Sequence, residues 1–425
     1  MKDHINADAG EIMQYIVHPY NDNTIRFILH YPGRIDADLL RQAALALACS
    51  VDVLHSSFVP GRIHAGWTVN RITADDCFTL VTAEEPREEA LRQALTPIRP
   101  KDPAQMRCIL VKGRQSCALV LLISHLCADG SDSKYLLRKL CEAYNLLLES
   151  GSCGALTVKN GSRAVAQVYE QLSRQDRRQL LKDPRTGIKS AFPYPSLEAG
   201  EPIVLHRHIS ADQMAQAHGK LHALGATIND LLLTACYYAY ADVAGADPRS
   251  AMSIMSMMDL RKHCEGGDSQ GLCNLTGGLT TALPEGLGDT FEATLLDIAS
   301  QTRRMKEDPF AGLYGMPLLH GAARRLPLGL LLAVIGRIYG SMAVGMTNIG
   351  SIDGHGLALG GMRPDQGWFG GPVKRKPGMQ ISAASFDGAC ALCIWGHAAK
   401  EDLPLLHGML DGMLRYIGDF CPAGR

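Results

Sequence analysis

The residues with the clearest capacity for chemistry lie in one short segment, SHLCADG, which runs from residue 124 to residue 130. His125 carries an imidazole whose ordinary pKa, about 6.5, lets it accept a proton at neutral pH. Asp129 could either orient that imidazole or pair with a cation, and Gly130 would permit a tight turn and the close approach of a facing strand. A lone histidine beside an Asp-Gly turn is also typical of an ordinary packed or solvated histidine, so the segment alone leaves both interpretations open.

The residues on either side of this segment predict the elements that hold it. Residues 118–124 form an apolar run rich in branched side chains, which favours a strand buried on both faces. Residues 131–148 place apolar side chains at helical spacing, with Ser131 as the expected N-cap. His125 is therefore expected where a buried strand ends and a helix begins, a kind of position where sites are often built.

Length and composition indicate a globular protein of two domains. A chain of 425 residues is too long for one ordinary core. Glycine and proline punctuate residues 150–200, which is typical of a crossover between domains. We predict an N-terminal domain over residues 1–185 and a C-terminal domain over residues 186–425.

Charge and hydropathy narrow the range of partners and locations. The 42 basic and 43 acidic residues nearly cancel and form no long run of one sign, which argues against nucleic acid or a strongly anionic membrane as partner. The apolar run at 326–335 is too short to span a bilayer, so no transmembrane segment is expected. The amino terminus has no apolar region of a signal peptide, and 13 scattered cysteines fit reduced thiols, so we expect a cytoplasmic protein.

No pattern predicts a metal site. Cys390 and Cys393 fall in an alternating strand pattern, which turns their sulfur atoms to opposite faces. Five other histidines have no partner at a spacing that suggests a metal ligand, namely His206, His208, His263, His320 and His355.

Strands and helices alternate in both halves of the chain, and each half contains a strand followed by a helix. Two strands are expected within residues 11–31. One strand is expected at each of the ranges 51–58, 63–69, 106–111, 118–124, 203–209, 253–260, 277–283, 344–349, 379–386 and 390–396. Helices are expected at 37–48, 84–95, 131–148, 164–181, 228–243, 291–305, 328–339 and 403–417, with another starting at Ser210. This order predicts an α/β fold (α+β, two-layer) whose sheets are covered by helices.

Several segments together resemble one family. SHLCADG is similar to the HHxxxDG signature of the condensation and chloramphenicol-acetyltransferase-like acyltransferase superfamily, near alcohol acetyltransferases and non-ribosomal peptide condensation-like proteins of secondary metabolism. The resemblance extends, in the right order, over residues 224–235, the MDLR of 258–261 followed by Asn274, the TNIG of 347–350 and the SFDG of 385–388. It covers the chain from about residue 11 to residue 417.

Two departures from the family pattern stand out. Ser124 occupies the place of the first histidine of the pair, whereas His125 matches the second, which is the catalytic one in this family. The late DFGWG-type motif is matched only weakly, by the DQGW of residues 365–368, which argues against the plant branch of the family.

The resemblance implies two chloramphenicol-acetyltransferase-like domains that form a V-shaped pseudo-dimer, with a tunnel reaching His125 from both faces. An acyl thioester, either acyl-CoA or an acyl carrier protein, would enter from one side, and a small hydroxyl or amine acceptor from the other. His125 would act as general base with no covalent intermediate and no cofactor. The absence of a GxSxG motif agrees with this mechanism.

The resemblance also implies roles for the remaining candidates. Asp129 would turn away from the imidazole and form a structural ion pair with Arg261. Thr347, Asn348 and Ser124 are candidate contacts to the oxyanion or the substrate. Two alternatives stay open: a catalytically silent condensation-like protein that serves as a binding or scaffold partner of a multienzyme synthase, and an enzyme that runs another reaction, such as epimerisation, at the same base.

Overall fold

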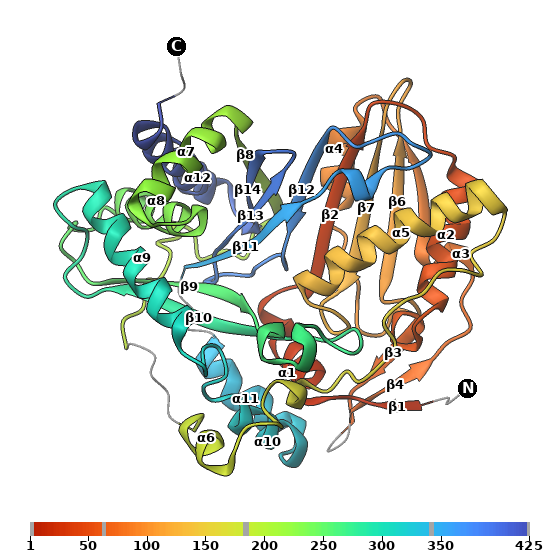
Figure 1. Ribbon diagram of the computed structural model, residues 1–425, viewed down its shortest axis with the longest axis horizontal. Coiled ribbons are helices and arrows are strands. Elements are labelled where there is room, and N and C mark those ends of the chain that lie inside the picture. The colour runs from red at the N-terminus through yellow and green to blue at the C-terminus, as the bar shows by residue number, and fades with distance from the viewer. Residues whose placement is uncertain (1–3, 62–64, 182–186, 340–343, 423–425) are drawn as a thin grey trace.

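The computed structural model describes residues 4–61, 65–181, 187–339 and 344–422. They form two lobes, each built on a sheet covered by helices, and a smaller sheet packs beneath the first lobe (Figure 1). This mixed architecture confirms the predicted α/β fold class. The predicted boundary between residues 185 and 186 lies outside the described residues, so the two domain ranges stay a prediction.

The sheet of the first lobe has the strand order β12-β2-β7-β6-β5. Its strands are β2 (Thr24–Tyr31), β5 (Phe78–Thr82), β6 (Met106–Lys112), β7 (Cys117–Ser124) and β12 (Gln366–Gly370). Every residue of the central strand β7 is buried, because alternate side chains enter two different cores. Leu121 packs toward α2 (Ala37–Cys49) and α5 (Gly130–Ser150), whereas Val120 packs toward α4 (Pro86–Gln93).

The end of β7 is fixed by its pairing and by the helix that follows. Ser124 is in register with Thr24 of the antiparallel strand β2, so His125 is the first residue beyond the strand. The N-cap of α5 is Asp129, whose carboxylate accepts a hydrogen bond from the backbone N–H of Asp132 at 3.0 Å. The prediction that Ser131 caps this helix was therefore wrong by two residues, because the carboxylate of Asp129 already occupies the capping position.

The second lobe contains a sheet with the strand order β10-β9-β11-β13-β14-β8. Its strands are β8 (Glu201–Ile209), β9 (Met252–Asp259), β10 (Thr276–Leu283), β11 (Gly345–Ile352), β13 (Gln380–Phe386) and β14 (Ala389–Ala398). Helices α7 (Ala211–Leu224), α8 (Ile228–Ala244), α9 (Phe291–Glu307) and α12 (Leu403–Phe420) cover it. The capping boxes expected at Ser210 and Thr227 are both present, and α8 is buried along most of its length.

The two halves of the chain are joined by more than a linker. Strand β12 belongs to the second half but pairs with β2 in the sheet of the first lobe, with Phe369 opposite Phe27. The loop before β10 returns to the first lobe as well, because the backbone N–H of Asp129 donates to the carbonyl of Cys273 at 3.2 Å. These two connections place the end of β7 where the lobes meet.

Some expected elements differ from the observed ones. The first of the two strands expected within 11–31 is a helix, α1 (Ala9–Val17), because Asp8 and Glu11 form a capping box at its start. The helix expected at 164–181 is reduced to a 3-10 turn, Val165–Val168, and to α6 (Arg174–Gln179), which restarts at its own cap, Ser173. The remaining elements are β1 (His4–Asn6), β3 (Ser56–Val59), β4 (Gly66–Val69), α3 (Ala74–Cys77), α10 (Met316–Arg325) and α11 (Leu328–Tyr339).

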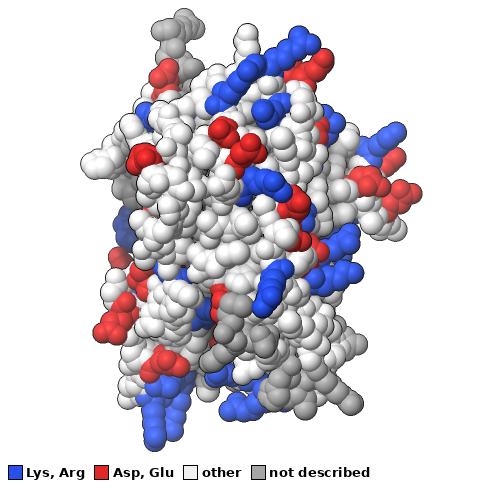
Figure 2. All heavy atoms as spheres, turned by 90° about the vertical axis from the view of Figure 1, so that its right-hand side faces the viewer, with Lys and Arg blue, Asp and Glu red and all other residues white. Residues whose placement is uncertain are grey.

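Within the part of the chain that the structure describes, no helix is long and apolar enough to cross a membrane. The cysteines are free thiols, and most of them are buried. No group of three metal-ligating side chains is found among the described residues. On the face of the first lobe seen in Figure 2, acidic and basic side chains are interspersed, in agreement with the near-neutral charge.

Candidate active site

His125 lies at the edge of a cavity between the lobes. Its backbone N–H donates to the carbonyl of Asn23 at 2.7 Å, which anchors the residue as it leaves β7. Its half-buried side chain lines a cavity of about 440 Å³, which we call the histidine cavity. Four other predicted site residues line the same cavity, namely Asp129, Gly130, Thr347 and Asn348. The fold therefore brings five candidates from distant parts of the chain to one place.

Asn274 determines which nitrogen of His125 is free. The amide nitrogen of Asn274 donates to the backbone carbonyls of His125 at 2.7 Å and Leu126 at 3.3 Å, which orients the amide oxygen toward the imidazole. That oxygen lies 2.7 Å from Nδ1 of His125. Because an amide oxygen only accepts, Nδ1 must carry the proton and Nε2 must carry the lone pair.

Electrostatics keep this imidazole neutral at physiological pH. Burial is the main cause that lowers the pKa of His125 below its ordinary value, and the charge of Lys374 adds to the effect, while Asp129 and Asn274 oppose it. A neutral imidazole with a free Nε2 can accept a proton from a hydroxyl or an amine. The family resemblance in the sequence included Asn274 after the MDLR segment, but it did not identify Asn274 as the partner of His125.

Asp129 is turned away from the imidazole and toward Arg261. The guanidinium donates to Asp129 from Nη1 at 2.8 Å and from Nη2 at 3.1 Å. The backbone N–H groups of Asp132 and Leu275 donate to the same carboxylate at 3.0 and 2.8 Å. With both oxygens engaged in this way, the carboxylate is a connector between the lobes.

A second buried carboxylate, Asp132, shares the same arginine and was not singled out in the sequence. Nη2 of Arg261 lies 2.8 Å from Asp132, which also accepts a hydrogen bond from the backbone N–H of Cys273 at 2.9 Å. Burial and the nearby charge of Asp129 raise the pKa of Asp132 to about 6, although Arg261 opposes the shift. In sequence, an aspartate in the first turn of a helix is an ordinary feature, so no local signal distinguishes it.

Gly130 does not have the conformational role that the sequence suggested. It is the first residue of α5 and is not among the glycines with positive φ, so the turn does not require glycine. A Cβ atom at this position would lie 3.4 Å from Cδ1 of Ile349, at the limit of ordinary contact. The close approach of the facing strand is therefore present, and the missing side chain leaves that space to the histidine cavity.

The three candidate oxyanion or substrate contacts are placed differently. Thr347 and Asn348 lie on β11 and line the histidine cavity. The carbonyl oxygen of the Asn348 side chain accepts from the N–H of Gly350 at 2.9 Å, which leaves its amide N–H groups as donors. Ser124 is fully buried and outside the lining, and its hydroxyl accepts from the N–H of Leu126 at 3.4 Å. Ser124 thus supports the backbone of the turn instead of facing the cavity.

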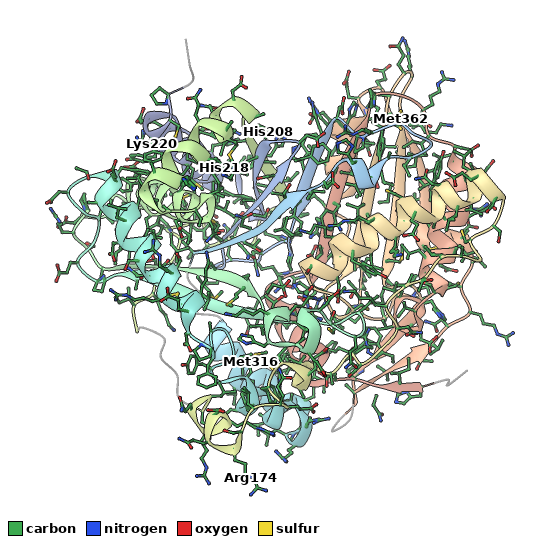
Figure 3. All side chains as sticks on the ribbon, in the orientation of Figure 1. Arg174, His208, His218, Lys220, Met316 and Met362 are labelled. Carbon is green, nitrogen blue, oxygen red and sulfur yellow. The ribbon has the colours of Figure 1, made fainter. Side chains whose placement is uncertain are left out.

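A second cavity adjoins the first. It has a volume of about 520 Å³ and is lined by four methionines, Met13, Met255, Met305 and Met316. We call it the methionine cavity; Met316, labelled in Figure 3, is the first residue of α10. Gly277, Gly278 and Met255 line both cavities. Since Asn274 lines one cavity and its partner His125 lines the other, the hydrogen-bonded pair lies at their junction.

Trp368, which ends the weakly matching late motif, and the next residue, Phe369, face opposite sides of β12. Phe369 lines the histidine cavity and packs against Phe27, with ring centroids 5.4 Å apart. Trp368 is buried on the other side of the strand, where its indole N–H donates to Nε2 of His208 at 3.0 Å. His208, labelled in Figure 3, is exposed and contacts the ring of Trp368 edge-on, with the two ring centroids 5.6 Å apart.

Comparison with known proteins identifies the fold. No protein-family model matches the sequence. No curated protein matches it. Among solved structures, the first condensation domain of the CDA synthetase superimposes with a TM-score of 0.72 at 14% identity, over 100% of this chain and 98% of that one. The chain has the condensation-domain fold.

Two further structures with this fold extend the comparison. The trichothecene 15-O-acetyltransferase from Fusarium sporotrichioides matches with a TM-score of 0.71 at 13% identity, over 97% of this chain and 95% of that one. The polyketide synthase associated protein 5 from Mycobacterium tuberculosis matches with a TM-score of 0.64 at 15% identity, over 98% of this chain and 100% of that one. The resemblance seen in the sequence is thus confirmed as a shared condensation fold.

Proposed function

We propose that this protein is an acyltransferase that moves an acyl group from a thioester to a hydroxyl or amine acceptor, with His125 as general base. The observation that carries the proposal is the hydrogen bond between Asn274 and Nδ1 of His125. It leaves an unprotonated Nε2 at the junction of two cavities, where two substrates could meet.

The reaction needs no covalent intermediate on the protein. Nε2 of His125 takes the proton of the acceptor hydroxyl or amine while the acceptor oxygen or nitrogen attacks the thioester carbonyl. The carbon–sulfur bond then breaks, and the imidazolium returns its proton to the departing thiolate. General-base assistance of this kind contributes about 10²–10⁴-fold, and the alignment of both substrates contributes further.

Each cavity suits a different substrate. Methionine side chains are flexible and apolar, so the methionine cavity would accept an acyl chain. The histidine cavity presents hydroxyl, amide and lysine groups, which suit a small polar acceptor. The hydroxyl of Thr347 and the amide of Asn348 are the candidate donors to the developing oxyanion.

The donor would be acyl-CoA or an acyl carrier protein. The solved neighbours include a condensation domain of a synthetase and a polyketide synthase associated protein, which supports a carrier-protein thioester beside acyl-CoA. No cofactor is needed, because the thioester itself supplies the activated acyl group.

The proposal is tested by incubating the purified protein with acyl-CoA thioesters of increasing chain length and a panel of alcohols and amines. Products should be detected by mass spectrometry, because the exposed thiol of Cys49 would react with a thiol reagent. His125→Ala should lower turnover at least about 100-fold. The matched control is His397→Ala, because His397 is also half-buried and hydrogen-bonded but lines neither cavity.

The unfolding temperature of His125→Ala should stay close to that of the wild type, because the ring faces a cavity. Activity of this variant within tenfold of the wild type would show that His125 is not the base. A wild-type protein that transfers no acyl group from CoA or carrier-protein thioesters would leave the scaffold role as the better account.

A further inference from the structure

Lys374 places a positive charge in the histidine cavity from a fixed backbone. Its N–H donates to the carbonyl of Trp395 at 3.0 Å, and its carbonyl accepts from the N–H of His397 at 2.8 Å. A bridge to Asn21 holds the other side. Its side chain lines the histidine cavity together with that of His125.

Among the described residues, the ammonium group of Lys374 has no hydrogen bond and no ion pair. The negative charge of Asp22 acts to raise its pKa, but the oxygens of Asp22 are already engaged. They accept from Arg26, from the N–H of Thr24 at 3.2 Å and from the N–H of Val373 at 2.9 Å. The carboxylate whose charge acts on Lys374 is therefore already occupied by other donors.

Lys134 is a natural comparison because it is the other lysine that lines this cavity. Its ammonium group donates to the backbone carbonyls of Ile349 at 3.2 Å and Ser351 at 3.3 Å. The ammonium group of Lys134 thus donates its hydrogen bonds within the protein. The N–H donors of the Lys374 ammonium group have no such partner among the described residues. Two lysines of equal charge in one cavity have different capacities to bind a ligand.

The side chain of Lys374 is half-buried at the cavity, so its ammonium group is only partly removed from water and has no partner there among the described residues. Burial lowers the pKa of Lys374 to about 8, so the group still carries its charge for most of the time at neutral pH. A charge without a protein partner beside a candidate reacting centre is typical of a functional group.

We propose that Lys374 binds a carboxylate group carried by the acceptor substrate. This inference rests on the proposed acyltransfer function and narrows its substrate class to acceptors that hold an acid group a few atoms from the reacting hydroxyl or amine. Lys374 is close enough for its charge to act on His125. A phosphate of CoA or of a carrier arm is attached at the far end of the pantetheine chain from the thioester, so it would lie away from this point.

The bound carboxylate would also affect the base. It would neutralise Lys374 and remove the effect by which that charge lowers the pKa of His125. The imidazole would become a stronger base when the correct acceptor is present, which would couple recognition to reactivity.

The test is equilibrium binding by calorimetry at pH 7 without any thioester, so it does not depend on turnover. The probes are 3-hydroxyoctanoate and its neutral amide, 3-hydroxyoctanamide. The wild type should bind the acid at least tenfold more tightly than the amide. Lys374→Met should bind both probes equally, and the matched control Lys134→Met should keep the preference for the acid.

One further variant and one further probe distinguish the possible results of the binding experiment. His125→Ala should keep the preference for the acid even though it loses transfer, so that failure of the acyltransfer proposal and failure of this one can be told apart. Octyl phosphate serves as the alternative anion. Tight binding of octyl phosphate without binding of the acid, equal binding of acid and amide by the wild type, or a preference for the acid that survives in Lys374→Met would each overturn the proposal.

Discussion

The ion pair between Asp129 and Arg261 allows a prediction that separates a structural role from a catalytic one. Arg261 contacts two buried carboxylates, Asp129 and Asp132, each at 2.8 Å. The substitution Arg261→Met removes the only guanidinium that these two carboxylates share among the described residues and leaves two like charges side by side. Removing one partner of a buried pair costs about 3–5 kcal/mol, and the second stranded carboxylate favours the upper part of this range.

The substitution Asp129→Asn should cost less. Arg261 keeps Asp132 as a partner and also Asp259, at 3.0 Å. The amide oxygen that the substitution introduces could still accept the hydrogen bond from the N–H of Leu275, which the carboxylate accepts at 2.8 Å. We expect a loss of about 1–3 kcal/mol. The double variant should lose less than the sum by about 0.5–3 kcal/mol, because the two changes affect one network.

The effect of pH gives this prediction a second readout. The pKa of Asp132 is raised to about 6 in the folded protein, above its ordinary value of 3.8, so its ionisation disfavours the folded state. The penalty is present at pH 7 and is relieved as the pH falls through 6. Without Arg261 the pKa should rise further, so Arg261→Met should lose less stability at pH 5 than at pH 7.

The assay is urea denaturation of the wild type, both single variants and the double variant at pH 7 and pH 5, with turnover measured in parallel. Additive losses of stability would refute the shared network. A large loss of turnover in Asp129→Asn at unchanged stability, without a similar effect in Arg261→Met, would instead assign to Asp129 the orientation of His125.

Three other predictions concern the tautomer of His125 and the walls of the cavities. Asn274→Asp should raise the pKa of His125, because a carboxylate favours the imidazolium, and the acidic limb of kcat/KM should move to higher pH; an unchanged profile would mean that Asn274 does not contact the working base. Gly278→Leu should exclude long acyl donors with little effect on the unfolding temperature, because a Cβ atom there meets only Sδ of Met255 at 3.8 Å. The neighbouring change Gly277→Ala should destabilise the protein by about 1–3 kcal/mol, because its Cβ would lie 2.7 Å from the carbonyl oxygen of Gly312; the opposite order of the two unfolding temperatures would contradict this packing.

The elements around His125 could be predicted because their signals are local. The branched apolar run of β7 and the helical spacing of α5 are both read within a few residues, and both elements are present. Strand β12 was not predicted, because a short segment rich in glycine gains its strand conformation only by pairing with β2, more than 300 positions earlier in the chain. The helix α1 was missed because its capping box was not recognised within an apolar pattern that also suits a strand.

The residues of the site also divide into those with a local sequence signal and those that depend on distant contacts. His125 stands out by its residue type and its place after a strand, and the partnership of Asp129 with Arg261 was inferred from the family resemblance. Nothing near Asp132 indicates that it shares that arginine, because the contact joins residues 129 positions apart. Likewise, the sequence does not distinguish Lys374 from other basic residues in loops. Only the structure shows that Asp22 is occupied by other donors and leaves the ammonium group of Lys374 without a partner among the described residues.

The central claim is that His125 presents an unprotonated Nε2 at neutral pH. Nuclear magnetic resonance of the protein with ¹⁵N-labelled histidine measures this directly, with His125→Ala used to assign the signal. The tautomer with the proton on Nδ1 and a pKa below 6.5 is the result expected from the contact with Asn274 and from burial. A proton on Nε2, or an imidazole that is charged at pH 7, would contradict the account.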